Sequence, residues 1–343
     1  MMRYFISTIL MLSVAAAAGH GGAGWWRLYF TSPARPAIQN WKKNPEAGLV
    51  SIIERAQRSV HGAFYDISSR PVAGALINAR KRGVEVKLVM DRRMKSSEER
   101  RRISARYEAA GIASVMRTAG RSGLMHNKFA VIDGTWLWTG SYNASRNDAV
   151  KNNNNAILIN SVELAGIYED EFAEMFDEGI FGNRGERRPF ADLRKRYHVR
   201  IGENDINAYF SPDDDVERII LKRLQKAKSS IYFMAFSFTS PAIGEMMIHR
   251  HREGVAVYGL FERKGSRTGH SQYTKMKVEG LPVKMDRGRG LMHHKVIIID
   301  AERVIMGSYN FSRNASRSND ENILVIDNRE IAQEFLAEFK RLY

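Results

Sequence analysis

Two stretches of this chain are copies of one another, and most of the positions they share are polar. Residues 124–155 and 291–322 align without a gap over 32 positions and are identical at 15 of them. The shared positions include His126/His293, Lys128/Lys295, Asp133/Asp300, Gly140/Gly307, Ser141/Ser308, Tyr142/Tyr309, Asn143/Asn310, Ser145/Ser312, Arg146/Arg313 and Asn155/Asn322. A fold repeat alone would keep core residues and turns. The retained side chains can bind ligands and transfer protons, which predicts one site built from both copies.

The repeat extends beyond these stretches and predicts two α/β halves. Segments with helical spacing of apolar residues alternate with short apolar runs suited to buried strands, such as residues 59–67 and 230–238. Helices that alternate with buried strands indicate an α/β sandwich in each half. We therefore expect a first repeat over residues 25–180, a basic linker over 181–206 and a second repeat over 207–343.

The charge balance favours an anionic partner. The chain has 53 Lys and Arg against 38 Asp and Glu, a net charge of +15, which suits nucleic acid, an acidic membrane surface or a phosphate-bearing substrate. Two basic stretches, residues 92–121 and 263–289, run directly into the repeated motif. They form either a basic rim around the site or an ordinary solvated face. We assign Arg100, Arg101 and Arg102 to substrate binding.

The first residues are typical of an export signal. Arg3 is followed by an apolar run over residues 4–14 and then by four alanines, which predicts a cleavable signal peptide over residues 1–18 and a secreted or periplasmic protein. The alternative is an uncleaved membrane anchor, although a spanning helix needs about 20 apolar residues. The chain has no cysteine, which excludes disulfides, thiolate metal sites and a cysteine nucleophile.

The repeated motif resembles that of the phospholipase D superfamily. Each copy has His-x-Lys-x4-Asp followed by Gly-Ser-x-Asn, and the resemblance covers nearly all of the chain after the predicted signal peptide. The superfamily includes phospholipases, phosphatidyltransferases, small endonucleases and nucleic-acid repair enzymes. The resemblance implies that the halves form a pseudo-dimer within a monomeric chain, with one active site at their interface and both histidines facing the phosphorus.

Phosphodiester cleavage suits these residue types. One imidazole can attack phosphorus and form a phosphohistidine while the second protonates the departing oxygen. Lys128 and Lys295 would hold the non-bridging oxygens, where charge must be stabilised in the transition state. This scheme assigns His126 and His293 to catalysis and needs neither a metal nor another cofactor.

Other motif residues have supporting roles in this scheme. The amides of Asn143 and Asn310 can donate hydrogen bonds to the phosphate oxygens, and Ser141 and Ser308 can order the site. The aspartates of the motif lie five residues after the lysines, where alternation along a strand turns them away from the histidines. We expect a structural role for the two aspartates, which are Asp133 and Asp300.

The two copies differ at one position that bears on the histidines. Glu321 lies 28 residues after His293, where the resemblance implies an acidic partner for the histidine ring, and Asn154 is its counterpart after His126. A carboxylate stabilises an imidazolium, whereas an amide oxygen only fixes the tautomer. We therefore expect Glu321 to keep His293 protonated as the acid and His126 to attack. The alternative is that Asn154 weakens turnover of the intermediate.

The substrate remains open between nucleic acid and phospholipid. Two halves of about 150 residues leave little room for large insertions at a lipid-binding mouth. This compactness and the basic rim resemble the small secreted endonucleases of the superfamily. A phospholipase D or phosphatidyltransferase is the alternative, because acidic lipids also attract a basic protein. A third hypothesis is an inactive protein that binds nucleic acid or membranes, against which both complete histidine–lysine pairs argue.

Overall fold

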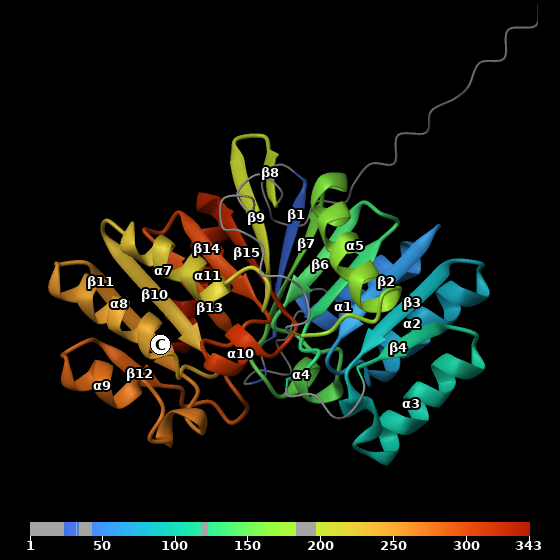
Figure 1. The fold of residues 1–343 in the computed structure, drawn as a ribbon, viewed down its shortest axis with the longest axis horizontal. Coiled ribbons are helices and arrows are strands. Elements are labelled where there is room, and N and C mark those ends of the chain that lie inside the picture. The colour runs from blue at the N-terminus through green and yellow to red at the C-terminus, as the bar shows by residue number, and fades with distance from the viewer. Residues whose placement is uncertain (1–23, 32, 34–42, 118–122, 183–196) are drawn as a thin grey trace, which may run out of the picture.

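The chain folds into two similar α/β halves that lie side by side (Figure 1). The structure is a computed structural model, and it describes residues 24–31, 33, 43–117, 123–182 and 197–343. The predicted signal peptide lies outside the described residues. Each half contains one mixed sheet, of seven strands in the first half and eight in the second. The predicted pair of α/β halves is therefore confirmed.

The first half contains one sheet and helices on both of its faces. The strands are β1 (Trp26–Phe30), β2 (Ser59–Phe64), β3 (Glu85–Met90), β4 (Ala113–Met116), β5 (Lys128–Ile132), β6 (Trp136–Gly140) and β7 (Asn155–Asn160). The helices are α1 (Pro45–Arg55), α2 (Arg70–Lys81), η2 (Arg92–Lys95), α3 (Glu98–Ala109), α4 (Arg146–Val150) and α5 (Val162–Phe176).

The second half repeats this plan. Its strands are β8 (His198–Ile201), β9 (Asn204–Ser211), β10 (Ser230–Ala235), β11 (Ala256–Phe261), β12 (Val283–Met285), β13 (Lys295–Ile299), β14 (Arg303–Gly307) and β15 (Glu321–Asp327). Its helices are α7 (Val216–Gln225), α8 (Pro241–Arg252), η3 (Gly265–Arg267), α9 (Tyr273–Val278), α10 (Arg313–Arg317) and α11 (Arg329–Leu342).

The strand order is the same in both sheets. The first sheet runs β1-β7-β6-β5-β2-β3-β4, and the second runs β9-β15-β14-β13-β10-β11-β12 with β8 added beyond β9. Strand β8 pairs with β9 through residues 198–201, which the sequence analysis assigned to the linker. The described part of the second half thus begins earlier than residue 207. Most of the predicted linker, residues 183–196, lies outside the described residues.

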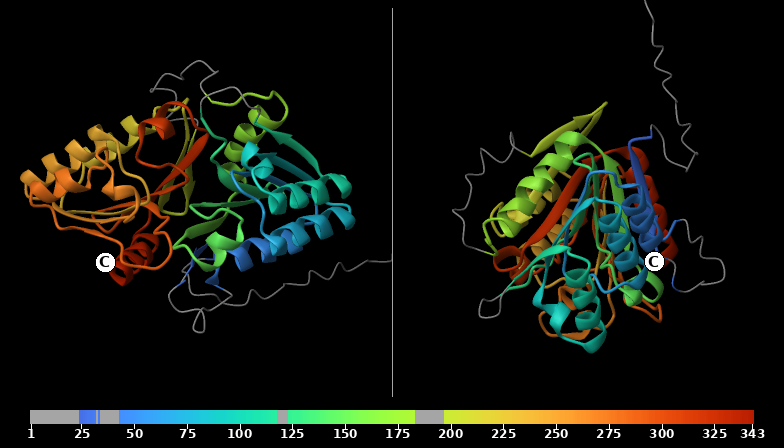
Figure 2. Two further views of the ribbon diagram at one scale, coloured as in Figure 1. Left: turned by 90° about the horizontal axis from the view of Figure 1, so that it is seen from below. Right: turned by 90° about the vertical axis from the view of Figure 1, so that its right-hand side faces the viewer.

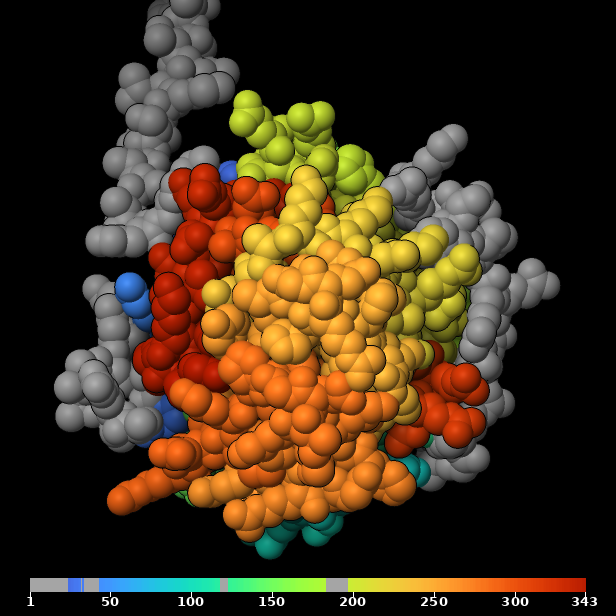
Figure 3. Space-filling model, turned by 90° about the vertical axis from the view of Figure 1, so that its left-hand side faces the viewer, coloured from blue at the N-terminus to red at the C-terminus, as the bar shows by residue number. Residues whose placement is uncertain are grey.

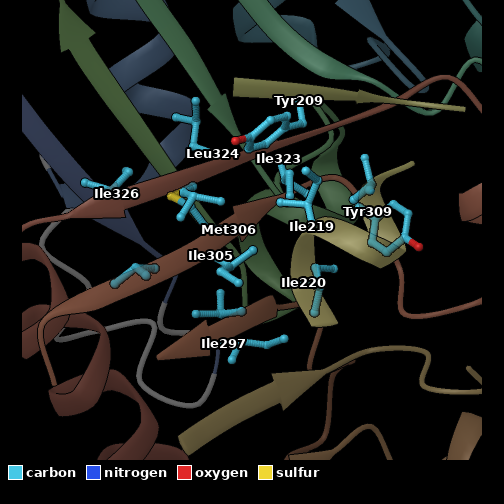
Figure 4. Packing of buried hydrophobic residues seen from close by; sticks show 14 of the residues in the cluster. Tyr209, Ile219, Ile220, Ile297, Ile305, Met306, Tyr309, Ile323, Leu324 and Ile326 are labelled. Atoms are coloured by element: carbon cyan, nitrogen blue, oxygen red, sulfur yellow. The ribbon is translucent and has the colours of Figure 1, made fainter. Parts of the chain in front are cut away.

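The sheets are buried on both faces, as their continuous apolar runs require. In β5, Phe129 and Val131 belong to one core cluster, whereas Ala130 and Ile132 belong to another, because side chains alternate across a strand. The second half has a dense aliphatic core along β13 to β15 and α7 (Figure 4). Its labelled members are Tyr209, Ile219, Ile220, Ile297, Ile305, Met306, Tyr309, Ile323, Leu324 and Ile326.

One of the core clusters continues across the boundary between the halves. The Tyr168 ring of α5 has its centroid 5.0 Å from Phe129 of β5 and 5.0 Å from Phe210 of β9. Its hydroxyl donates to the Asn322 amide oxygen at 3.3 Å. Because one apolar core includes side chains of both halves, the halves are held as a single folded unit rather than as two domains on a linker.

The short helices that follow the repeated motif, α4 and α10, lie at this boundary (Figure 1). Seen from below, α4 and the C-terminal helix α11 lie on the same side of the junction (Figure 2). From the side of the second half, residues around 250–290 cover the middle of the surface and the C-terminal residues lie along one edge (Figure 3). Among the described residues, no helix has the length and apolar content needed to cross a bilayer.

Candidate active site

Backbone hydrogen bonds cross between the repeats at each histidine. The His126 amide donates to the Asp320 carbonyl at 2.9 Å, and the Asp320 amide donates back to Leu124 at 2.9 Å. The second copy makes the same exchange, since the His293 amide donates to Asn153 at 2.9 Å. Each histidine therefore lies beside the segment that precedes the last strand of the other repeat.

The lysines of the motif lie on the same side of their strands as the histidines. Lys128 and Lys295 are the first residues of β5 and β13, two positions after the histidines, so the pairs share a strand face. Lys128 Nζ donates to the His126 carbonyl at 2.6 Å, and Lys295 Nζ donates to the His293 carbonyl at 2.9 Å. Both side chains are buried. The arrangement concentrates two ammonium groups between two imidazoles.

Glu321 bonds to His126, which corrects the predicted pairing with His293. The distance between His126 Nδ1 and Glu321 Oε2 is 2.7 Å. Ser308 also donates to this oxygen at 2.8 Å, and Asn319 donates to Oε1 at 2.9 Å. The sequence prediction was wrong because it paired residues within one repeat, whereas the backbone exchange places residues 320–321 beside the histidine of the other repeat.

His293 has an amide partner in place of a carboxylate. Its Nδ1 lies 2.8 Å from Asn154 Oδ1. The Asn154 amide is oriented by two contacts, since its nitrogen donates to the Asp148 carbonyl at 3.2 Å and its oxygen accepts from Ser141 Oγ at 3.1 Å. The oxygen must therefore accept the Nδ1–H of His293. In the neutral ring this network places the hydrogen on Nδ1. Nε2 can then accept a proton and later release it.

The Gly-Ser pair of the motif allows the last strand to approach closely. Gly140 has φ +158°, and a Cβ there would lie 2.4 Å from the Asn155 carbonyl oxygen. Ser141 follows at once, and its Oγ accepts from the Asn155 amide at 3.0 Å. Gly307 and Ser308 repeat this geometry. The predicted ordering role of the serines thus has a geometric basis, because each one holds the residue that contacts a histidine.

An aromatic ring lies beside each histidine–lysine pair, and sequence reasoning missed both rings. The Tyr65 centroid is 4.9 Å from the His126 ring and 5.3 Å from Lys128 Nζ. The Phe236 centroid is 4.6 Å from the His293 ring and 4.8 Å from Lys295 Nζ. Such contacts limit the rotation of the imidazole and favour a charged lysine. The signal was present, because positions 65 and 236 align between the repeats.

Arg93 is a third cation near the site that the sequence analysis did not single out. Its guanidinium carbon lies 5.2 Å from the Tyr65 centroid, and its Nη1 lies 3.4 Å from the Tyr65 hydroxyl. Asp66 holds it from the other side at 3.5 Å. The positive charge of Arg93 contributes to lowering the pKa of His126. Arg93 can therefore assist the lysines in binding an anion.

The structure engages the three arginines assigned to substrate binding with other protein groups. Arg100 donates to Asp66 Oδ2 through two nitrogens, at 2.7 and 3.0 Å. Arg102 forms an ion pair with Glu98 one helical turn away, and Arg101 donates to a backbone carbonyl. Arg100 thus forms an ion pair with Asp66, and the same carboxylate positions Arg93. The direct role predicted for these arginines has no support in the geometry.

The motif asparagines have unused hydrogen-bonding capacity. Within the described residues, the buried amide oxygens of Asn143 and Asn310 have no hydrogen-bond partner. Buried polar groups normally have one, and these two oxygens are acceptors that would suit a hydrogen-bond donor rather than a phosphate oxygen. Asn143 Nδ2 donates to Asp148 at 2.6 Å, which fixes the orientation of its amide. The donation from the two amide groups to phosphate oxygens stays a prediction.

The motif aspartates bind backbone amides at the ends of their strands that are far from the histidines. Asp133 accepts hydrogen bonds from the amides of residues 57–59, and Asp300 accepts from those of residues 228–230. Both residues have positive φ at the turn between two strands. The structure therefore places them as turn residues that anchor the start of β2 and β10.

Three cationic side chains lie at the site. Across the described ranges, no group of three His, Asp or Glu side chains is placed to hold a metal ion. The cations are Lys128, Lys295 and Arg93.

Burial and charge keep both histidines neutral when no anion is bound. Burial lowers the pKa of His126 well below its ordinary value, and the Lys128 and Lys295 ammonium groups lower it further. The pKa of His293 falls for the same reasons. Burial also lowers the pKa of Lys128 to about 8 and raises the pKa of Glu321 to about 7. A phosphodiester anion would offset the two ammonium charges and raise the pKa of the histidines.

Comparison with known proteins gives the class of the chain. The family described as "Cardiolipin synthase, PLD-like domain" matches residues 49–176 and 220–343, which together make up more than half of the chain. A phospholipase D of Rickettsia conorii is 30% identical over 143 residues, covering 41% of this chain and 72% of that protein. A mitochondrial cardiolipin hydrolase of Mus musculus is 33% identical over 124 residues, covering 36% and 56% respectively.

A solved structure supports the fold over almost the whole length. Phosphatidylserine synthase of Haemophilus influenzae superposes with a TM-score of 0.66, covering 92% of this chain and 84% of that one, at 12% identity. The chain belongs to the phospholipase D-like family. It is a phosphodiesterase of the phospholipase D type, with two copies of the domain in one chain.

The depressed pKa of Lys128 predicts how anion binding depends on pH. Lys128 is protonated below about pH 8 and loses its proton above it. We expect the affinity for sulfate, whose own charge stays constant, to fall above about pH 8 by up to about tenfold per pH unit. Isothermal titration calorimetry across this range measures the effect. Lys128→Arg should shift the fall to higher pH, since arginine stays charged. Constant affinity up to pH values near the ordinary pKa of lysine would contradict the prediction.

Proposed function

We propose that this chain hydrolyses phosphodiester bonds of nucleic acid through a phosphohistidine on His126, without a metal or other cofactor. The observation that carries the mechanism is the different partner of each histidine: the carboxylate of Glu321 for His126 and the amide of Asn154 for His293. Because Glu321 contacts His126 rather than His293, its carboxylate serves the nucleophile and not the acid as the sequence had suggested. By accepting Nδ1–H it makes the imidazole a better nucleophile and stabilises the positive charge that the ring gains on attack.

The first step forms the covalent intermediate. Neutral His126 attacks phosphorus through Nε2, so that an N–P bond forms while the bond from phosphorus to the leaving oxygen breaks. Protonated His293 gives its Nε2 proton to the leaving oxygen and becomes neutral. Lys128, Lys295 and the amides of the motif asparagines stabilise the non-bridging oxygens, where negative charge develops.

The second step reverses the roles of acid and base. A water molecule enters on the side that the leaving group has vacated, and neutral His293 takes its proton as the water oxygen attacks phosphorus. The N–P bond to His126 breaks, which releases the phosphate monoester and restores the neutral imidazole. His293 ends the cycle protonated, as it began it.

A basic cavity close to the backbone of the His293 segment supports nucleic acid as the substrate. The cavity has a volume of about 990 Å³ and lies between α4, residues 286–291 and the end of α11. Its wall includes Leu291 and Asn153, which flank the His293 backbone contact. The cations that line the cavity are Lys151, Lys264, Arg287, Arg289 and Arg341. A second hollow of about 470 Å³ is lined by Arg263, Lys264 and Arg267 and so shares Lys264 with the first.

The free cations favour a polyanion over a single headgroup. Within the described residues, Lys151, Arg287 and Arg289 are exposed and have no ion-pair partner. Several exposed positive charges around one cavity suit the repeated phosphates of a nucleic-acid strand. A phospholipid is the second candidate, because curated relatives bear the names phospholipase D and mitochondrial cardiolipin hydrolase.

Neutralising the basic cavity should reduce the salt dependence of nucleic-acid binding. The variant replaces Lys151, Arg287 and Arg289 by glutamine in a His126→Ala background that prevents cleavage. For single-stranded DNA, the negative slope of log affinity against log salt should become less steep by about 2. Fluorescence anisotropy at several salt concentrations measures this slope. With His126 intact, the triple variant should still hydrolyse bis-nitrophenyl phosphate, which is too small to reach the cavity.

A matched triple variant controls for the change in net charge. The control residues are exposed and lie before β3 and β10, at the ends of the strands that are far from the histidines. They are Lys81, Lys226 and Lys228. Their replacement by glutamine should leave the slope unchanged. Hydrolysis of phosphatidylcholine or cardiolipin vesicles by a protein that cleaves neither DNA nor RNA, assayed in EDTA, would favour the phospholipid candidate instead.

The two histidine variants should differ in what they retain. His126→Ala should abolish turnover and the acid-labile phosphoryl-enzyme. His293→Ala should lose about 10²- to 10⁴-fold on an unactivated diester, the usual contribution of a general acid, and far less on a nitrophenyl diester whose leaving group needs no proton. Rapid quench and peptide mapping identify the modified residue. Phosphate on His293 would reverse the assignment.

We further propose that the protein is exported by cleavage of the signal peptide predicted for residues 1–18. The support is the basic start and the apolar run that precede four alanines. Mass spectrometry of protein from culture supernatant or periplasm should show a chain that begins near Gly19. A chain that keeps Met1 and sediments with membranes would contradict this proposal and favour the anchor.

A further inference from the structure

The two copies of the motif differ in where they carry a buried carboxylate. Position 154 is asparagine where the second copy has Glu321, and position 148 is aspartate where the second copy has Ala315. At these two positions each copy therefore carries one acidic side chain, and the two lie six residues apart in register. Because the histidines contact the opposite copy, the carboxylate of the first copy lies on the His293 side.

Asp148 lies at the centre of the contacts that hold this side of the site. Its Oδ2 accepts from the Asn143 backbone amide at 2.9 Å and from Asn143 Nδ2 at 2.6 Å, and its Oδ1 accepts from Asn152. Its carbonyl holds the Asn154 amide. Its Oδ2 also lies 3.9 Å from His293 Nδ1, and the side chain is 5% exposed.

We propose that Asp148 is a positioning residue that keeps His293 in its protonated, proton-donating form once a phosphodiester or another anion is bound, in place of the carboxylate that the first copy lacks at position 154. This inference rests on the proposed function, since it assigns a reason for the division of labour between the histidines. Asp148 touches neither reacting atom, and it acts through Asn154, through Asn143 and through its charge.

The charges around His293 show why a carboxylate is needed there. Lys295 from β13, Lys128 and His126 from the first half, and the neighbouring His294 all lower the pKa of His293 when they carry positive charge. Within the described residues, Asp148 is the acidic group in ion-pair range of the His293 ring. Its negative charge also favours the charged forms of Lys128 and Lys295. An imidazolium between two ammonium groups would otherwise have no counter-charge.

The indirect placement also suits an acid. A carboxylate bonded directly to Nδ1, as Glu321 is to His126, stabilises the positive ring most strongly and favours attack by its Nε2. A carboxylate beyond an intervening amide stabilises the charge less, so that His293 can still release its proton to the leaving oxygen. The asymmetry of positions 148 and 154 therefore gives the nucleophile a direct carboxylate contact and the acid an indirect one.

Asp148→Asn tests this role with substrates that differ in their leaving groups. Cleavage of an unactivated dinucleotide should fall by about 10²-fold, and cleavage of a nitrophenyl diester by much less. The alkaline limb of the rate–pH profile should move to lower pH, because His293 without its counter-charge loses its proton earlier. Equal losses on both substrates with an unchanged profile would overturn the proposal.

Two further variants separate charge from folding. Asn154→Glu added to Asp148→Asn places a carboxylate directly on His293 and should restore the alkaline limb. Asp327→Asn serves as the control, because Asp327 loses the same charge but pairs with Arg303 at the end of β15 far from the histidines. It should leave the rate–pH profile unchanged even if the melting temperature falls. A double variant that does not recover would overturn the proposal.

A direct titration keeps the test independent of activity. Nuclear magnetic resonance of ¹⁵N-histidine-labelled protein with sulfate bound should show a lower pKa for His293 in Asp148→Asn than in the unaltered chain, and the same value would overturn the proposal. If Asp148→Asn does not fold, Asp148→Glu gives the same readout, since it moves the carboxylate relative to the ring. An unaltered chain that cleaves no diester would instead contradict the proposed function, while the titration would still decide the role of Asp148.

Discussion

The active site depends on the exchange of backbone hydrogen bonds between the repeats. The segment that contains each histidine pairs with the segment that precedes the last strand of the other half, at residues 320 and 153. Neither half could complete its own site, because the side chain that contacts each Nδ1 comes from the other copy. The apolar core shared through Tyr168 stabilises this arrangement from behind.

Buried charge is the second constraint. Two lysines and two histidines share a pocket from which water is largely excluded, so each positive charge lowers the pKa of the others. Glu321 and Asp148 supply the negative charge on opposite sides, and the aromatic rings of Tyr65 and Phe236 add a weaker stabilisation. Such a site is electrostatically incomplete until a phosphate anion enters, which favours binding of the substrate over an uncharged molecule.

Several features could be predicted because they follow from local pattern. The alternation of helices and apolar strands determined the two α/β halves, and the repeated polar residues identified the histidines and lysines of the site. The expectation that Asp133 faces away from the histidines and has a structural role followed from alternation along a strand. Arg100 was a different case, because a basic run in sequence says nothing about which guanidinium already has a carboxylate partner such as Asp66.

The sequence by itself determined which residues make up the site, because a gapless repeat that keeps His, Lys, Ser and Asn has a chemical purpose that fold alone does not require. Only the tertiary structure decided which residues are partners. Glu321 lies closer in sequence to His293, yet it bonds to His126, and Asp148 lies near His293 although 145 positions separate them. The reason is that contacts across an interface depend on how two halves are docked, and no local spacing within either half encodes that docking.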